Sequence, residues 1–389
     1  MMDHSPTHEA ATAQPSLFNL DPANPYPVFA HLRALGAVVR VPIPAAYRQG
    51  AVWIVTRFDE AVRVLKDARF TVDASASDTL AGSGSVGFFG GRSMISVDGA
   101  DHTRLRGLVS RAFTPRYIET LRPGIQRIAD ALLDRVQARG TMDLVQEYGY
   151  PLPITVICDM LGVPHDQRDH LLEGSAFITD LLAEKRRYPG DDLLGQLVRM
   201  EAAGDHLDEQ ELRAMIGLLI FAGHETTANL ISIGVLTLLD HPEVLARLRA
   251  DPDLIPAAIE ELLRFNGPVH TPAPRFARED LELAGQRIRR GDLVLVALGS
   301  VNHDEAAFTD PESLDIARAL SRHIAFGQGA HFCLGAPLAR LEGDIALRTL
   351  LRRMPDLRLA AARDSIEWRG DVSLRGVTAL PVAFSPGQG

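Results

Sequence analysis

The stretch from Leu212 to Leu239 constrains the fold of this chain most, because it is apolar on nearly every face of a helix. Such a helix either spans a membrane or lies inside a large protein core. Asp208 and Glu211 form a capping-box pattern at its start. Its centre, Ala222-Gly223-His224-Glu225-Thr226-Thr227-Ala228-Asn229, carries a charge and several polar groups, which would be costly in lipid. We therefore predict a buried helix with a functional site at its midpoint.

The residues at this midpoint suggest how a site is made. Ala222 and Gly223 leave space beside the helix for a ligand. Threonine hydroxyls compete for backbone carbonyls and locally distort a helix. The alternative is a polar patch in contact with solvent. It requires one exposed helix face, and the apolar flanks argue against that.

A second unusual segment surrounds Cys333, in Phe326-Gly327-Gln328-Gly329-Ala330-His331-Phe332-Cys333-Leu334-Gly335. Three glycines in ten residues indicate a tight loop. Pro337 then begins a helical pattern, where its missing N–H costs nothing. The thiol therefore lies at a loop-to-helix junction, where the helix dipole favours a thiolate. A lone cysteine is more often a small core residue, but a thiolate fixed here suits the axial position of a haem iron.

The Cys333 segment closely resembles the haem-binding loop of the cytochrome P-450 family, since aromatic, glycine, basic, Cys and glycine residues fall in register. Ala222 to Thr226 resembles the family's oxygen-activation motif Ala-Gly-any-acid-Thr. The resemblance runs from about residue 20 to the C-terminus. It implies a mainly α protein with a minor β region, one large domain at 21–389 and a flexible arm at 1–20. It also implies haem b ligated by Cys333, with Glu225 and Thr226 as general acids for oxygen cleavage.

Glu261 and Arg264 share one helix face and resemble the family's Glu-x-x-Arg motif. Most such pairs are exposed surface bridges that contribute little. By the resemblance, Arg318 is the third member of a buried network that fixes the fold behind the Cys loop. His323 matches a frequent family position to which no role is assigned.

Haem propionates are anions that need cationic or donor partners. By the resemblance these are Arg275, His331, His102 and Arg106, the last two four residues apart on one helix face. Phe326 begins the Cys loop, and we expect its ring to pack near the sulfur and tune it. Each of the four propionate candidates, taken alone, is more simply interpreted as a solvated surface residue. Because all four occur in register with the family's pattern, propionate binding is favoured.

The composition indicates the cellular compartment and argues against some classes of binding partner. The net charge is −10, which does not favour nucleic acid or an anionic membrane as a partner. The two cysteines, Cys158 and Cys333, do not form a disulfide framework, and a reducing compartment is expected. We interpret Cys158 as core. The polar N-terminus lacks an apolar signal-peptide segment. We expect a soluble, cytoplasmic monomer without a membrane anchor.

Hydrophobic periodicity gives a coarse map of the elements. We predict helices at 26–35 and 58–67, a strand hairpin at 38–41 and 51–56, mainly helix from 101 to about 265, and extended segments at 281–284, 292–298 and 376–382. Residues 73–93 are a glycine-rich loop that falls where the family places a substrate-covering loop. Candidate substrate contacts are Phe88, Phe89, Phe221, Ala222 and Val269.

One segment departs from the family pattern. Only 24 residues separate Pro164 from Pro189, where most relatives carry two long helices that roof the substrate pocket. A helix of that length would span about 36 Å, which leaves no room for two long helices and a loop. We predict a truncated or rebuilt roof, with a more open pocket or one closed by another surface.

The function implied is a haem-thiolate monooxygenase that uses O2 to hydroxylate or epoxidise an apolar small molecule in secondary metabolism. The chain has no flavin or iron–sulfur domain, so electrons would come from an external ferredoxin and ferredoxin reductase. Whether the substrate is free or bound to a carrier protein stays open. Two alternatives are a peroxide-driven peroxygenase, which tends to replace the acid-Thr pair, and a non-catalytic haem-binding recruitment module, which usually loses the Cys or that pair.

Overall fold

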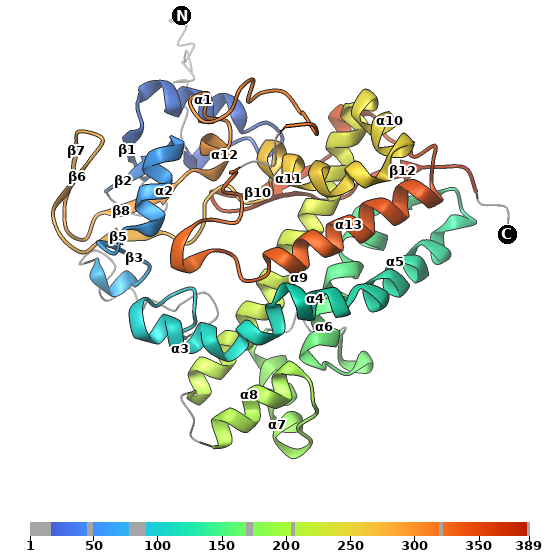
Figure 1. Ribbon diagram of the computed structural model, residues 1–389, viewed down its shortest axis with the longest axis horizontal. Coiled ribbons are helices and arrows are strands. Elements are labelled where there is room, and N and C mark those ends of the chain that lie inside the picture. The colour runs from blue at the N-terminus through green and yellow to red at the C-terminus, as the bar shows by residue number, and fades with distance from the viewer. Residues whose placement is uncertain are drawn as a thin grey trace, which may run out of the picture.

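The fold is that of a mainly helical protein with several small β-sheets, the largest of them at one side of the molecule (Figure 1). The computed structural model describes residues 17–44, 50–77, 91–168, 174–203, 207–318 and 322–386. The α-helices are α1 (Tyr26–Leu35), α2 (Phe58–Lys66), α3 (Gly99–Ser110), α4 (Pro115–Thr120), α5 (Arg122–Gln137), α6 (Pro151–Leu161), α7 (Ser175–Arg187), α8 (Leu193–Ala202), α9 (Glu209–Asp240), α10 (Pro242–Ala250), α11 (Ile255–Asn266), α12 (Leu298–Val301) and α13 (Ala336–Arg353).

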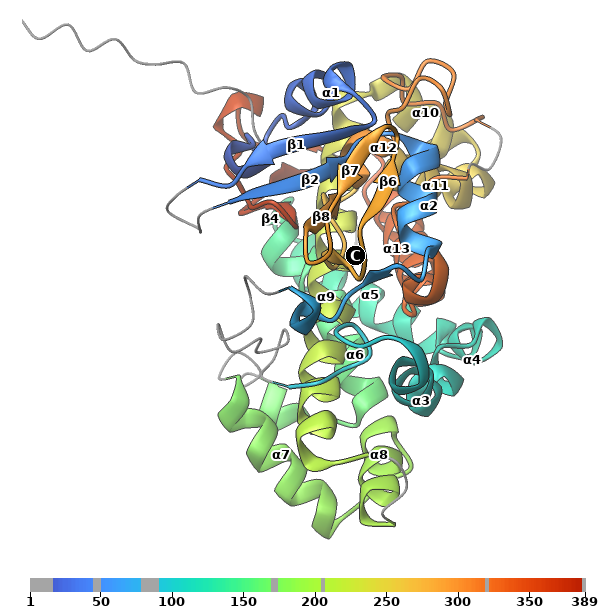
Figure 2. The same ribbon diagram turned by 90° about the vertical axis from the view of Figure 1, so that its left-hand side faces the viewer.

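The predicted central helix is α9, which runs through the middle of the molecule (Figure 2). The Asp208 side chain accepts the N–H of Glu211, and the Glu211 side chain accepts the N–H of Asp208, so the predicted capping box is formed. α6, α11 and α13 pack against α9. The prediction of a buried helix is confirmed, because most of its side chains are buried.

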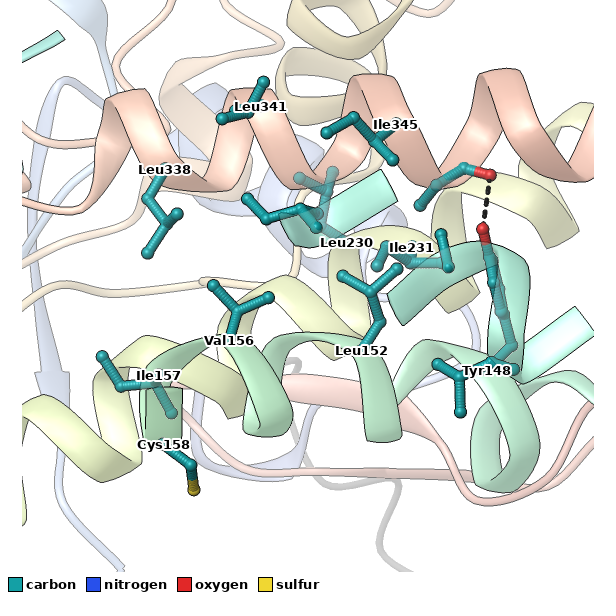
Figure 3. Packing of buried hydrophobic residues seen from close by; sticks show 14 of the residues in the cluster. Tyr148, Leu152, Val156, Ile157, Cys158, Leu230, Ile231, Leu338, Leu341 and Ile345 are labelled. Carbon is teal, nitrogen blue, oxygen red and sulfur yellow. Dashed lines mark hydrogen bonds between the residues drawn. The ribbon is translucent and has the colours of Figure 1, made fainter. Parts of the chain in front are cut away.

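Side chains from α6, α9 and α13 meet in the main core (Figure 3). Leu152 and Val156 of α6 face Leu230 and Ile231 of α9 in this cluster. The Tyr148 hydroxyl, just before α6, donates a 2.9 Å hydrogen bond to the Ala346 carbonyl of α13. Cys158 is fully buried in the same core and forms no disulfide, as predicted. This packing holds α9 and α13 at a fixed separation.

The strands form small sheets beside the helical core. They are β1 (Val38–Pro42), β2 (Ala51–Val55), β3 (Phe70–Thr71), β4 (Thr141–Asp143), β5 (Arg275–Ala277), β6 (Leu281–Leu283), β7 (Gln286–Ile288), β8 (Leu293–Val296), β9 (Arg358–Leu359), β10 (Trp368–Gly370), β11 (Arg375–Val377) and β12 (Pro381–Ala383). The largest sheet has the order β1-β2-β8-β5-β3. β1 and β2 pair antiparallel, which confirms the predicted hairpin.

The C-terminal segment predicted to be extended carries parts of two strands, β11 and β12. Residues 376–382 do not form one strand, because β11 pairs with β10 while β12 lies between β4 and β9 in another sheet. The chain therefore changes sheets within these few residues. This places the β10–β11 hairpin against α9, which bears on the site below.

Ordered structure begins within the segment 1–20 predicted to be a flexible arm. Leu17–Asn19 form a short 3₁₀ turn, and Leu17 is fully buried in a cluster with Phe29 and Ile54. An apolar side chain that loses all contact with water stabilises its position. The boundary predicted at residue 21 therefore lies at least four residues too late, while residues 1–16 lie outside the described part.

The segment between α6 and α8 is short, as the sequence predicted. Among the described residues between Pro164 and Pro189, α7 is the single α-helix, and its 13 residues span about 20 Å. α7 packs on α8 and α9 at one end of the molecule (Figure 2). The predicted substrate-loop residues Phe88 and Phe89 lie outside the described residues.

Candidate active site

The loop before α13 holds the Cys333 sulfur in a defined position. The Cys333 N–H donates to the Phe326 carbonyl at 2.9 Å and closes the loop on itself. Gly329 has a φ of +75°, and a Cβ there would collide with the Leu65 carbonyl of α2. Only glycine meets both conditions at this position without strain.

The sulfur lies in a mostly buried setting with donors around it. Burial raises the pKa of the Cys333 thiol, while the backbone N–H groups of Gly335 and Ala336 and the Arg106 and Arg340 cations act to lower it. The net direction is upward, so the predicted thiolate bias from the helix terminus is outweighed by burial. An iron cation would reverse the balance, because a coordinating thiol is deprotonated outright.

A cavity of about 270 Å³ lies between the Cys loop and the middle of α9. Cys333 and Phe326 form one wall, and Ala222, Gly223 and Thr226 form the opposite wall. Among the sequence-predicted residues, those lining the cavity are Cys333, Phe326, His331, Arg106, Arg275, Ala222, Gly223, Thr226 and Val269. The structure thus brings together residues up to 227 positions apart in the chain, from Arg106 to Cys333.

Gly223 and Thr226 shape the α9 wall. A Cβ on Gly223 would approach the Ile157 side chain of α6 to 2.8 Å, so glycine permits the close contact of α6 and α9. The Thr226 hydroxyl donates to the Ala222 carbonyl at 3.0 Å, the contact that the sequence predicted. It leaves the oxygen lone pairs available toward the cavity. α9 nevertheless continues as one α-helix through this point.

Among the described residues predicted to act in catalysis, haem binding or substrate contact, three do not line the cavity: Glu225, His102 and Phe221. The Glu225 carboxylate instead forms a 2.6 Å ion pair with Arg369 of β10 and accepts a hydrogen bond from Asn229. The Phe221 ring lies 6.5 Å from that of His224, and its predicted contact with substrate stays a prediction. Glu225 and Phe221 do not line the cavity because the helical period turns neighbouring residues of α9 to different faces.

Arg275 supplies a buried cation at the cavity edge. It is 4% exposed and donates to the Ala273 carbonyl at 2.7 Å. No carboxylate among the described residues lies within ion-pair distance of it. Burial lowers the pKa of Arg275 to about 10, with Asp98 acting in the opposite direction. A buried cation without an anion is costly, so this group fits a ligand that carries carboxylates.

Arg106 and His331 line the cavity together with Arg275, and His102 packs against His331. The buried His102 Nε2 has no hydrogen-bond partner among the described residues, and its ring lies 4.4 Å from that of His331. Burial, followed by His331 and Arg106, lowers the pKa of His102 to about 4. His331 Nε2 contacts Asp98 at 2.8 Å, and Arg106 donates to the Phe332 carbonyl at 2.8 Å. A thiol wall, an apolar slot and an unpartnered cation together fit haem.

Comparisons with known proteins decide the family. The cytochrome P450 family model matches residues 166–355. The polyketide biosynthesis cytochrome P450 PksS of Bacillus subtilis is 40% identical over 93% of this chain and 96% of its own length. The cytochrome P450 monooxygenase PikC of Streptomyces venezuelae is 40% identical over 98% of both chains. The chain belongs to the cytochrome P450 family.

The solved P450 structures agree with this fold. One of them, P450BioI in complex with an acyl carrier protein ligated to hexadec-9Z-enoic acid, superposes with a TM-score of 0.85 and 36% identity. It matches 93% of this chain and 99% of that one. The chain is thus a haem-thiolate oxidoreductase of the monooxygenase class with haem b as its cofactor. Bound haem supplies the iron at which dioxygen is reduced and its O–O bond is cleaved.

A buried charge network lies behind the Cys loop of this P450. Arg264 donates two 2.8 Å hydrogen bonds to Glu261, and Arg318 donates to Glu261 at 3.2 Å. Arg264 also donates to the carbonyls of Asn302, Pro311 and Ser313. These contacts tie α11 to the segment that precedes the Cys loop.

Sequence reasoning missed a second cluster that reaches the Cys loop. Glu260 accepts hydrogen bonds from Arg340 at 2.6 and 2.8 Å and contacts His323 at 3.0 Å. The Arg340 guanidinium lies 4.6 Å from the centre of the Phe326 ring. The signal was the second acid in Glu260-Glu261 and the basic residue that follows Cys333 by seven positions. This cluster gives His323 a structural partner and fixes the Phe326 ring in the cavity wall.

One helix of the described chain is long and apolar enough to cross a membrane. This is α9, and 72% of its most apolar window is buried inside the protein. The same helix forms the cavity wall opposite Cys333. Its length and hydropathy therefore reflect its place in the core.

Proposed function

We propose that the chain hydroxylates or epoxidises an apolar small molecule of secondary metabolism, with electrons from an external ferredoxin and ferredoxin reductase. The balanced reaction takes substrate, O2, two electrons and two protons to oxygenated product and water. The observation that carries this proposal is the cavity itself, with the Cys333 sulfur on one wall and the Thr226 hydroxyl on the other. Its remaining walls are mainly apolar.

The chain's own residues would divide the work as follows. Cys333 would bind the haem iron, and the cations Arg275 and Arg106 would neutralise the propionates. His102 and His331 would hold the propionates by donating hydrogen bonds. Thr226 would hold a proton at its hydroxyl inside the cavity. Glu225 would bring protons from outside the cavity, since its carboxylate lies against the β10–β11 hairpin.

The first experiment tests the sulfur. The reduced carbonyl complex of the wild-type protein should show the red-shifted Soret band of thiolate ligation, and Cys333→Ser should lose it. Cys158→Ser is the matched control and should keep the band, because Cys158 lies in the core away from the cavity lining. A wild-type carbonyl complex without the shifted band would refute the proposal.

The second experiment separates the monooxygenase from a peroxygenase. Myristic acid, found with one solved relative of 38% identity, is a suitable first probe for a spin-state shift. Product should form with NADPH, ferredoxin, reductase and O2. Turnover with hydrogen peroxide alone and none with the electron donors would favour the peroxygenase, while haem binding without turnover in either assay would favour a recruitment module.

The ferredoxin would dock on the face that lies over the Cys loop. Arg111 and Arg116 are exposed, and Arg116 lies on α4, which packs against α13. Tyr117 of α4 and Phe332 of the Cys loop are exposed large side chains. Acidic donors are attracted to such cations, mainly through the association rate. Arg116→Gln should raise the apparent KM for ferredoxin and flatten its salt dependence. Unchanged kinetics would place the docking face elsewhere.

A carrier-bound substrate is a further part of the proposal. No described residue of 165–188 lines the cavity, and α7 is the one α-helix among the described residues of this segment. We propose that the pocket is more open on that side, which would admit a substrate carried by another protein. The solved complex of a relative with an acyl carrier protein supports the idea by analogy. An acyl group on a carrier protein should then shift the spin state at lower concentration than the free acid. We further propose that the chain acts as a cytoplasmic monomer.

A further inference from the structure

The acid next to Thr226 is held by a side chain from the far end of the sequence. Glu225 Oε1 lies 2.6 Å from Nη1 of Arg369, on β10. The Asn229 amide, one turn further along α9, donates to the same oxygen at 3.2 Å. Arg369 Nη2 in turn donates to Asn229 Oδ1 at 3.4 Å. The three side chains therefore form a closed ring of contacts.

The β10–β11 hairpin fixes this ring against α9. A Cβ at Gly376 of β11 would collide with the Asn229 amide, so the hairpin backbone reaches α9 only through a glycine. β10 and β11 pair in register, with Arg369 opposite Gly376. The position of the Arg369 backbone is thus set by the strand that touches Asn229.

Burial differs between the two charges. The Glu225 side chain is 13% exposed, whereas that of Arg369 is 47% exposed. Arg369 therefore joins a mostly buried carboxylate to bulk solvent and supplies its counter-charge. The other oxygen, Oε2, accepts no hydrogen bond from the described residues, and His224 Nε2 lies 4.0 Å from it. Burial lowers the pKa of His224, and its Nδ1 contacts the Ile220 carbonyl.

We propose that Arg369 is the positioning residue of proton delivery, holding Oε1 of Glu225 at the hairpin so that Oε2 stays free to move protons between solvent and the Thr226 side of α9. This proposal rests on the roles proposed above for Glu225 and Thr226. Arg369 touches neither the cavity nor the reacting atoms, so it acts only through the carboxylate. The ring holds that carboxylate in one place, as efficient general acid catalysis requires.

The test compares Arg369→Gln and Arg369→Lys with Arg363→Gln in the haem-loaded protein, using myristic acid as probe. Arg363 is the matched control, because it makes a comparably exposed 2.9 Å ion pair with Asp240 of the same helix. Wild-type turnover is measured first. Its failure refutes the proposed function, whereas an active wild type with an unaffected Arg369→Gln variant refutes the role of Arg369 alone.

For Arg369→Gln we expect product per electron pair to fall about three- to tenfold, with peroxide released in its place. KM for the probe should not change, the solvent deuterium effect on kcat should grow, and Arg369→Lys should recover part of the loss. The infrared C–O band of the reduced carbonyl complex should broaden, because the released carboxylate takes several positions.

Stability separates positioning from a structural role. The Arg369 end of the pair is exposed, and Glu225 keeps its hydrogen bond from Asn229 when Arg369 is replaced. Tm of Arg369→Gln should therefore stay within about 2 °C of wild type, like that of Arg363→Gln. If Arg369→Gln forms as much product per electron pair as Arg363→Gln does, the proposal is overturned. Loss of haem or folding in Arg369→Gln would overturn it too, because the ion pair would then be a structural contact.

Discussion

Replacing Arg264 with methionine should destabilise the protein strongly, although the side chain lies outside the cavity lining. Glu261 is 3% exposed and Arg264 is 1% exposed. Arg264→Met leaves the buried Glu261 carboxylate with the Arg318 guanidinium at 3.2 Å as its cation and the Asp315 N–H at 2.9 Å as a further donor. Removing one partner of a buried ion pair typically costs about 3–5 kcal/mol. Because Arg318 remains, we expect a loss near 3 kcal/mol, the lower end of that range.

This loss translates into a measurable change in melting temperature. An unfolding entropy of about 2.1 cal/mol/K per residue gives about 0.8 kcal/mol/K for 389 residues. A cost of about 3 kcal/mol therefore lowers Tm by about 4 °C. Circular dichroism melts of the haem-loaded protein would measure the shift, and haem absorbance would report whether the Cys loop is still held in place.

Arg213→Gln provides the comparison. Arg213 makes a 2.8 Å pair with Glu209 on the surface of α9, where both side chains are substantially exposed. Such a pair contributes at most about 1 kcal/mol. A double-mutant cycle with Glu261→Gln should show strong coupling for Arg264 and none for Arg213. If Arg264→Met lowers Tm no more than Arg213→Gln does, the buried-charge reasoning is wrong.

Three further predictions concern the cavity and its support. Gly223→Ala should place a methyl group against Ile157, lower the free energy of unfolding by about 1–3 kcal/mol and weaken haem retention. Adding Ile157→Val to this variant should restore part of the lost stability. Absence of such rescue would contradict the predicted clash between residues 223 and 157. Thr226→Val should preserve the spectrum of the reduced carbonyl complex but release more of the electrons as peroxide. If the variant forms as much product per electron pair as wild type, the Thr226 hydroxyl has no role in proton delivery. Burial opposes ionisation of Glu260, yet Arg340 and His323 hold its pKa at about 2. Because the pKa of Glu260 is lower in the folded than in the unfolded protein, its ionisation stabilises the fold above about pH 4.5, and this contribution is lost as the pH falls to about 2. In Glu260→Gln, the free energy of unfolding measured with urea should therefore change less between about pH 4.5 and 2 than in wild type. Parallel pH curves for the two proteins would refute this.

Local patterns were sufficient to predict the elements that carry the site. The capping box and the apolar run predicted α9 to within three residues at its start and one at its end. The β1–β2 hairpin and the helices α1 and α2 followed from periodicity in the same way. In each case the signal is contained within one element and its caps.

The remaining parts depend on contacts between distant segments. Nothing near Glu225 in the sequence indicates that its partner is Arg369, since that pairing depends on the β10–β11 hairpin reaching α9. The division of residues 376–382 between two sheets likewise depends on which strands lie alongside. Position along a helix gave the candidates at the midpoint of α9, but only the packed structure separates Thr226, inside the cavity, from Glu225, outside it.

The contact between Gly329 and the Leu65 carbonyl has a consequence for how the protein matures. The sulfur-bearing loop rests on a helix from the first sixth of the chain, 264 positions earlier. Contacts between such distant segments form late, because chain closure must precede them. A polypeptide emerging from the ribosome would therefore lack the finished iron ligand until its two ends have met. Cofactor capture should accordingly be one of the last events in maturation.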